Sequence, residues 1–183
     1  MKMKSLHDLF VDELKDLYNA ENQLLKALPK MAKAATAPEL SEAFTNHLAE
    51  TEKQVERLES VFEQLGMKPV GKTCKAMKGL IEEGKEVIED DMEDDVRDAA
   101  LIAAAQRVEH YEMAGYGCVR TYATLLGYED AAELLQETLD EEGTADKTLT
   151  QLSEEINVEA ENDEEEEEQT GKTATATRTK RRR

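Results

Sequence analysis

Aromatic side chains make up only 4% of this 183-residue chain, and tryptophan is absent. Proline and glycine are also scarce, with 3 and 9 residues, whereas the chain is rich in Ala, Leu, Glu and Lys. Aromatic residues favour strands, and the four abundant residues favour helices. The composition therefore predicts an all-α protein, long enough for one domain with a sizeable core.

Long apolar runs are missing as well. Nowhere do about 18 apolar residues follow one another, as a membrane-spanning helix requires, and the first eight residues lack the apolar core of a signal peptide. The two cysteines, Cys74 and Cys118, are far apart and form no C-x-x-C pair, which favours free thiols. We expect a soluble cytoplasmic protein that does not bind membranes.

Positive charge is in short supply. The chain has 23 Lys and Arg against 42 Asp and Glu, which gives a formal net charge of -19. Such a charge argues against a general nucleic-acid or anionic-membrane binder.

Apolar residues instead recur every three or four positions, the period of an amphipathic helix. Four long segments have this pattern, at about 5–31, 39–65, 96–126 and 131–156. A shorter amphipathic segment lies within the long connection 67–95, which can cross the length of a bundle. This order predicts a ferritin-like four-helix bundle with a short extra helix in the crossover between the second and third long helices.

Turn and cap residues suggest where these helices begin and end. Pro29 should kink or end the first helix, and Gly66 and Gly127 should end the second and third. Thr36 followed by Glu39 has the spacing of a capping box at the start of the second helix.

Carboxylates occupy positions on the apolar stripes, where burial is costly unless protons, cations or a metal neutralise them. Residues three apart on a helix share a face, so pairs of ligands can converge on one site. We predict the metal ligands Glu21, His47, Glu50, Glu109, Glu112 and Glu141, with Glu142 as an alternative to Glu141 on the last helix. A shift of 91 positions, which superposes Glu21 on Glu112 and Glu50 on Glu141, favours Glu141.

Each of these residues also has an interpretation without metal. Glu21 could pair with Arg107, and His47 could be a satisfied core histidine. Tyr116 could donate to a carboxylate or simply pack, and packing is the simpler expectation. His7 and His110 fall outside the stripes and are expected at the surface.

Four long motifs carry a resemblance to a known family. The chain resembles the YciF-like family of ferritin-like proteins, a stress-associated bacterial group catalogued as a domain of unknown function, in the runs L-Y-N-A-E-N-Q-L-L-K-A-L-P-K-M, H-L-A-E-T-E-K-Q-V-E-R-L, R-D-A-A-L-I-A-A-A-Q-R-V-E-H-Y-E-M-A-G-Y-G and L-D-E-E-G-T-A-D-K-T-L. The resemblance covers about residues 4–158. It implies a helical bundle that forms a homodimer, with a rubrerythrin-like di-metal centre in its core.

The ligand pattern departs from that of typical di-iron bundles. Those repeat E-x-x-H on two helices, whereas this chain has H-x-x-E at His47 to Glu50 and E-x-x-E at Glu109 to Glu112. A site with one histidine and many carboxylates suits manganese as well as iron. We expect two metal ions, iron or manganese.

Two functions are consistent with these features. The first is a stress-protective di-metal protein that handles peroxide, dioxygen or metal, with peroxidase or ferroxidase activity as its enzymatic form. The second is a metal-independent, stress-induced helical dimer that acts as an interaction protein.

The last residues differ in composition from the rest. Residues 159–168 are almost wholly acidic, and residues 172–183 are basic with small Thr and Ala between the charges. Blocks of like charge bury nothing, so we predict a bundle at 1–156 and a disordered tail at 157–183. The basic end is the one part of the chain where weak contact with nucleic acid is expected.

Overall fold

The computed structural model describes the backbone of residues 3–180 and the side chains of residues 3–161. This part of the chain contains no strand and five helices, which are α1 (Leu6–Ala34), α2 (Pro38–Gln64), α3 (Lys75–Glu89), α4 (Asp94–Leu126) and α5 (Glu129–Lys180). The prediction of an all-α protein is confirmed.

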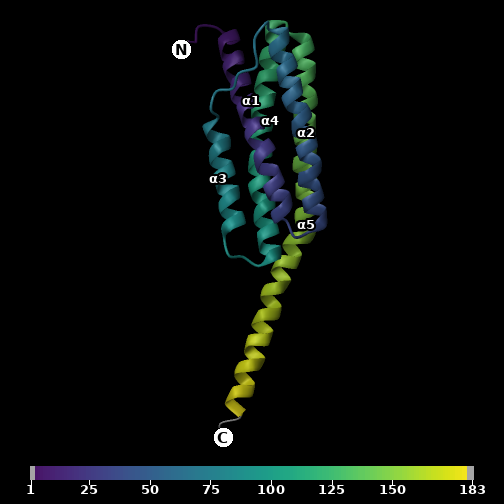
Figure 1. Cartoon of the computed structure of the whole chain (residues 1–183). Coiled ribbons are helices and arrows are strands. Elements are labelled where there is room, and N and C mark those ends of the chain that lie inside the picture. Colours follow the sequence, from purple (N-terminus) through teal and green to yellow (C-terminus); the bar gives the residue numbers. More distant parts are fainter. Residues whose placement is uncertain (1–2, 181–183) are drawn as a thin grey trace.

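Helices α1, α2, α4 and α5 form a four-helix bundle, and α3 packs on the outside against α1 and α4 (Figure 1). The chain runs along α1, returns along α2 and crosses back through α3, so that α4 runs parallel to α2 (Figure 1). This is the predicted ferritin-like bundle with a short helix in the crossover. None of the helices in the described part combines the length and the apolar run that a bilayer crossing needs.

Most helix ends follow from local chemistry. The Ser5 hydroxyl accepts a hydrogen bond from the amide of Asp8 at 3.1 Å and caps α1. Gly127 has a φ of 78°, a left-handed conformation that glycine adopts easily, and it ends α4. Pro29 lies inside α1, which continues to Ala34, so of the two effects predicted for this proline, a kink or the end of the regular helix, the helix does not end there.

The capping box predicted for the second helix is wrong. The N-cap of α2 is Ala37, whose side chain offers no acceptor, and Pro38 is the first helical residue. Asp98 of α4 takes the place of the cap, since its carboxylate accepts hydrogen bonds from the amides of Thr36 and Ala37 at 2.6 to 3.1 Å. A residue 61 positions away thus supplies the cap.

The core consists of two apolar clusters along the bundle axis. Phe10, Leu58 and Tyr116 belong to one, and Leu24, Phe44 and Leu101 belong to the other. Between these positions on each bundle helix lie buried polar residues, so a polar layer separates the clusters. On α4, Gly115 lies beside this layer, where a Cβ would come within 2.7 Å of Leu17 of α1. The small residue therefore lets the two helices approach closely.

Helix α5 is longer than the apolar pattern predicted. Ile156 is the last buried residue among its described side chains, but the helical backbone continues beyond the bundle to Lys180 (Figure 1). The side chains of 162–183, which include the basic end, lie outside the described residues. The division into a bundle and a disordered tail stays a prediction.

Candidate metal centre

The polar layer is built by ionisable side chains from all four bundle helices. Each is 6% exposed or less, and they are Glu21 of α1, His47 of α2, Glu109 and Glu112 of α4, and Glu142 of α5. The 3.6-residue period turns each of these positions toward the bundle axis, as the apolar stripes predicted, with Glu142 as the alternative to Glu141 on the last helix.

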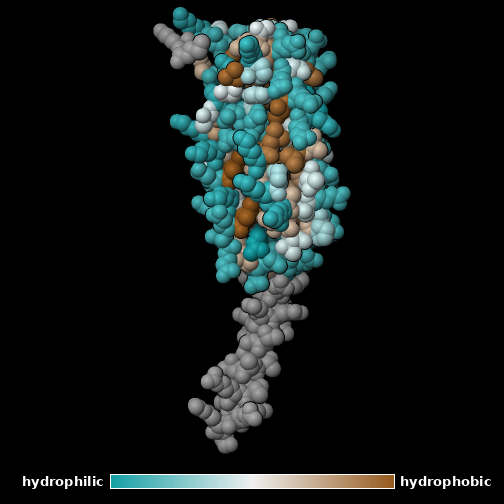
Figure 2. All heavy atoms as spheres, in the orientation of Figure 1, coloured by the Kyte–Doolittle hydropathy of each residue, from teal (hydrophilic) through white to brown (hydrophobic). Residues whose placement is uncertain are grey.

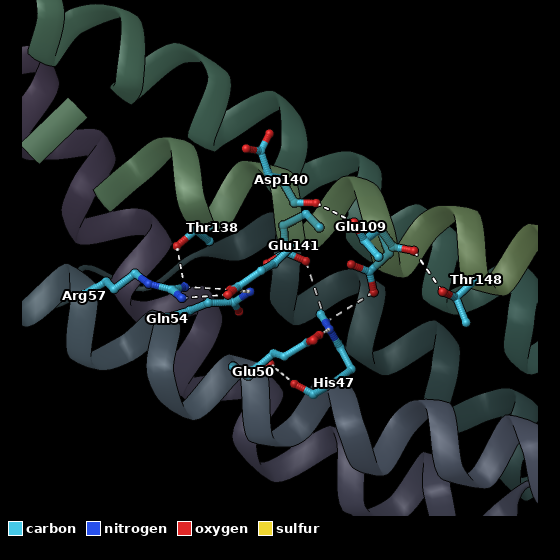
Figure 3. A network of polar contacts seen from close by, with 12 residues as sticks. His47, Glu50, Gln54, Arg57, Glu109, Thr138, Asp140, Glu141 and Thr148 are labelled. Atoms are coloured by element: carbon cyan, nitrogen blue, oxygen red, sulfur yellow. Dashed lines mark hydrogen bonds and ion pairs between the residues drawn. The ribbon is translucent and has the colours of Figure 1, made fainter. Parts of the chain in front are cut away.

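Four of these residues converge. His47, Glu109, Glu112 and Glu142 each offer one potential ligand atom, and these atoms all lie within 4.8 Å of one another. His47 Nε2 lies 3.4 Å from an oxygen of Glu109 (Figure 3). It also lies 3.7 Å from an oxygen of Glu142. These contacts join α2 to α4 and α5.

Glu21 lies beside this group. One of its oxygens accepts a hydrogen bond from the Tyr116 hydroxyl, and the other has no hydrogen-bond partner. Tyr116 was expected to pack, and it does so while also donating to the carboxylate. Arg107, the alternative partner of Glu21, is exposed.

Many polar atoms in this layer lack hydrogen bonds from the described residues. They are both oxygens of Glu112 and of Glu142, one oxygen each of Glu21 and Glu109, and His47 Nε2. His47 Nε2 is close enough to Glu109 for an ion pair, but the geometry is not that of a hydrogen bond. Buried polar atoms without partners are costly, and they accumulate where a protein binds an ion or a proton.

The carboxyl pKa values reflect this crowding. Burial raises the pKa of Glu21 to about 8, with a further increase from the charge of Glu142. Burial also raises the pKa of Glu109 to about 7. The pKa values of Glu112 and Glu142 are well above the ordinary value, because burial and the neighbouring carboxylates both oppose ionisation.

His47 behaves differently. Burial lowers its pKa, but the hydrogen bond to Glu50 and the charges of Glu142 and Glu21 outweigh burial, so that the pKa is raised. The layer therefore attracts positive charge.

Besides Glu21, two predicted ligands lie outside the converging group, Glu50 and Glu141. Glu50 is at the rim, with 42% of its side chain exposed and one oxygen 3.5 Å from His47 Nδ1. The hydrogen bond to His47 lowers its pKa. Glu50 therefore contacts the layer through His47, from the solvent side.

Glu141 does not reach the centre. Its two oxygens accept hydrogen bonds from Arg57 of α2 at 2.6 Å, and a third comes from Gln54 (Figure 3). The inward position belongs to Glu142, which is fully buried, so the structure favours the alternative ligand over Glu141. Neighbouring residues on a helix point in directions about 100° apart, so only one of them can face the axis.

The remaining histidines lie away from the layer. His110 is largely exposed and lies 3.3 Å from Asp146, and His7 contacts Tyr128. Sequence reasoning missed Gln54, a buried polar residue that donates to Glu141, follows His47 by seven positions and shares its helix face. The seven-residue spacing from His47 could have identified Gln54 from the sequence.

The residues present fit a hard or borderline metal ion. Four buried carboxylates and one imidazole match the oxygen-rich sets with some nitrogen that iron and manganese prefer. The unpartnered oxygens supply acceptors on the inner side of the layer. Glutamates from facing helices are also the ligand arrangement of ferritin-like di-metal bundles.

Comparison with known proteins agrees with the fold. The chain is 51% identical to the protein YciF of Escherichia coli K12 over 164 residues, which covers 88% of this chain and 99% of that protein. The crystal structure of the E. coli stress protein YciF superposes with a TM-score of 0.82 over 84% of this chain and 98% of that one.

A second solved structure, YcfI from Rhodopseudomonas palustris, is 45% identical with a TM-score of 0.80, over 81% of this chain and 95% of that one. A protein from Xanthomonas campestris pv. campestris, 22% identical, shares the fold with a TM-score of 0.68 over 88% of this chain and 99% of that one. Residues 5–161 match the family described as a domain of unknown function, DUF892. The chain belongs to this family.

Proposed function

We propose that this protein is a di-metal carboxylate protein that binds iron or manganese and protects against stress by handling peroxide, dioxygen or metal. The observation that carries the proposal is the buried layer of four glutamates and one histidine, drawn from all four bundle helices, with carboxylate oxygens that lack partners. An interaction module has no need of such a layer.

Each residue has a distinct part in this proposal. His47, Glu109, Glu112 and Glu142 would hold the metal, and Glu21 beside them would complete a second position. Iron or manganese bound there supplies one-electron redox chemistry toward peroxide or dioxygen. Tyr116 fixes the orientation of Glu21 through its hydroxyl.

The surroundings of the layer suit a reaction that needs bulk water excluded and protons exchanged with solvent. The two apolar clusters exclude water from above and below the layer. Glu50 is the ionisable group at the exposed rim, and its contact with His47 offers a route for protons between solvent and the buried carboxyls. The stress-protective role is supported by the E. coli relative, which is described as a stress protein and is 51% identical.

Metal analysis tests the proposal directly. Full-length protein loaded with Fe(II) or Mn(II) without oxygen and then desalted should retain about two ions per chain. Glu142→Gln should lose most of this metal, because it removes an inward ligand. Glu141→Gln is the matched control and should retain it, because Glu141 faces Arg57.

Peroxide consumption by the loaded wild type, with loss in Glu142→Gln, would support the redox form of the proposal. A wild-type protein that stayed metal-free and inert to peroxide would refute it and leave the metal-independent interaction protein as the better explanation. The homodimer expected from the resemblance remains a separate proposal, which sedimentation equilibrium can test.

A further inference from the structure

An apolar groove lies on the outside of the bundle, between α3 and the helices α1 and α4. It encloses about 740 Å³, within the range typical of small-molecule sites. In Figure 2, apolar atoms reach the surface between α3 and the bundle, with hydrophilic atoms on both sides. Its apolar lining is contributed by all three helices and includes Leu24, Met31, Leu80, Ile81, Ile88 and Val108.

The edge of this groove is unusually basic for so acidic a chain. Five cationic residues line it, Lys26, Lys30, Lys33, Lys85 and Arg97, against one acidic residue, Glu89. Lys85 already pairs with Glu89 at 3.2 Å, and Arg97 pairs with Asp94 at 2.8 Å.

The three groove lysines of α1 differ from Lys85 and Arg97 in their ion pairing. Lys26, Lys30 and Lys33 are exposed and form no ion pair with any residue in the described part of the chain. Their spacing of four and three places them on one side of α1, along one edge of the groove. Three uncompensated positive charges therefore border an apolar floor in a chain with a net charge of -19.

We propose that this groove binds a single-chain amphiphile with a negatively charged headgroup, such as a free long-chain alkyl carboxylate. The apolar floor accepts the alkyl chain, and the lysine ammonium groups pair with the head at the edge. The groove lies outside the polar layer, so the inference is independent of the metal centre.

Other occupants fit the groove less well. The acidic segment 159–168 of this chain or of a second copy has complementary charge, but its composition offers almost nothing apolar to cover the floor. An anionic membrane surface would meet the strongly acidic body of the protein as well as the lysines.

Calorimetric titration of the metal-free, full-length protein with dodecanoate below its micelle concentration tests the proposal. Saturable binding of one molecule per chain is expected. Each methylene removed should weaken binding about fourfold, because burial of apolar surface drives the interaction, so decanoate should bind about 15-fold more weakly. Dodecyl maltoside, which has the same chain and an uncharged head, should bind at least tenfold more weakly than dodecanoate.

Charge variants locate the site. The triple variant Lys26→Gln, Lys30→Gln, Lys33→Gln changes only exposed residues and should weaken dodecanoate binding at least tenfold. The control triple variant Lys4→Gln, Lys68→Gln, Lys147→Gln makes the same change in net charge at exposed residues that do not line the groove, and should alter the dissociation constant less than twofold.

Four results would overturn the proposal. The first is that dodecanoate does not bind saturably, and the second is that the two triple variants weaken binding equally. The third is that the uncharged amphiphile binds as tightly as dodecanoate. The fourth is that the protein binds anionic vesicles but not free dodecanoate. Sedimentation equilibrium adds a further check. If dodecanoate dissociated an oligomer of the wild type, the groove would be an interface with a second copy instead.

Discussion

Glu109 and Glu21 hold protons at pH values where an ordinary carboxyl has lost them. Their pKa values are raised to about 7 and about 8, from 4.5 for an exposed glutamate. Between pH 4.5 and 8 the folded chain therefore holds more protons than the unfolded chain. Under these conditions stability falls as pH rises, by about 1.4 kcal/mol per pH unit for each carboxyl that remains protonated.

We accordingly predict that the metal-free protein is most stable in mild acid. Urea unfolding in the presence of a chelator should give a lower free energy of unfolding at pH 8 than at pH 5.5. Glu109→Gln should make this dependence shallower, because it removes one titrating group. The variant also controls for general repulsion within the acidic chain, which it barely alters. A wild-type stability that rose with pH would contradict the assignment.

Tyr116 is the residue that holds Glu21 in place. Burial raises the pKa of its hydroxyl well above the ordinary value, so this group remains the donor. Removing it leaves both oxygens of Glu21 without a partner. Groups that orient metal ligands in this way are worth about 10-fold to 100-fold in affinity.

Tyr116→Phe should therefore weaken Mn(II) binding about 10-fold to 100-fold while helix content, followed by circular dichroism, stays unchanged. Tyr128→Phe is the matched control, since its hydroxyl faces His7 near the end of the bundle and the affinity should not change. Equal affinities for wild type and Tyr116→Phe would mean that Glu21 needs no support or is not a ligand.

The sequence identified most residues of the centre because burial of a charge is visible as an acid on an apolar stripe. Glu21, His47, Glu109 and Glu112 were found in this way. Glu142 was left as an alternative, because the stripe of the last helix accommodates either neighbour and the 91-residue shift favoured Glu141. What decided between them was Arg57 on α2, a partner whose position depends on tertiary packing.

At the scale of the helices, a residue of α4 stabilises the turn between α1 and α2. Asp98 is 1% exposed, and its carboxylate accepts hydrogen bonds from two amides at the start of α2. These bonds satisfy donors that no local side chain reaches, and they place a negative charge at the positive end of the helix. The bundle thus connects its first hairpin to its second at this end.

Asp98→Ala should destabilise the protein by about 3 kcal/mol, because hydrogen bonds from two amides to a charged acceptor are lost. Asp94→Ala is the control. Its exposed carboxylate pairs only with Arg97, so its loss should cost under about 1 kcal/mol. Equal losses in chemical denaturation would contradict the capping role.

The ends of the helices show where sequence reasoning lacks information. Ser5 and Gly127 act on their own neighbours, so their roles can be predicted locally. Asp98 acts across 61 positions, and the nearby Thr36 and Glu39 imitate a cap that does not form. Pro29 was expected to kink or end its helix, and the helix continues past it, because residues after it, including Met31, pack in the core.

At the scale of the whole molecule, the polar layer divides the core and couples both hairpins. Without a metal, the buried carboxyls of α1, α4 and α5 hold protons, and their mutual repulsion as they ionise opposes the packing of the two apolar clusters. A metal would reverse this effect, since it would attract these carboxylates and also bind the His47 imidazole of α2. Ligand binding to the folded state alone adds about 2.7 kcal/mol of stability at 100 times the dissociation constant.

Mn(II) should therefore raise the melting temperature of the wild type, and should do so more at pH 8 than at pH 6, because protons compete with metal for the carboxylates. The acidic surface could also bind cations without specificity, and Glu142→Gln separates the two effects. This variant removes a single inward carboxylate and leaves the surface unchanged, so its melting temperature should respond little to Mn(II). An equal rise in both proteins would place the bound ions on the surface of the bundle and not in its core.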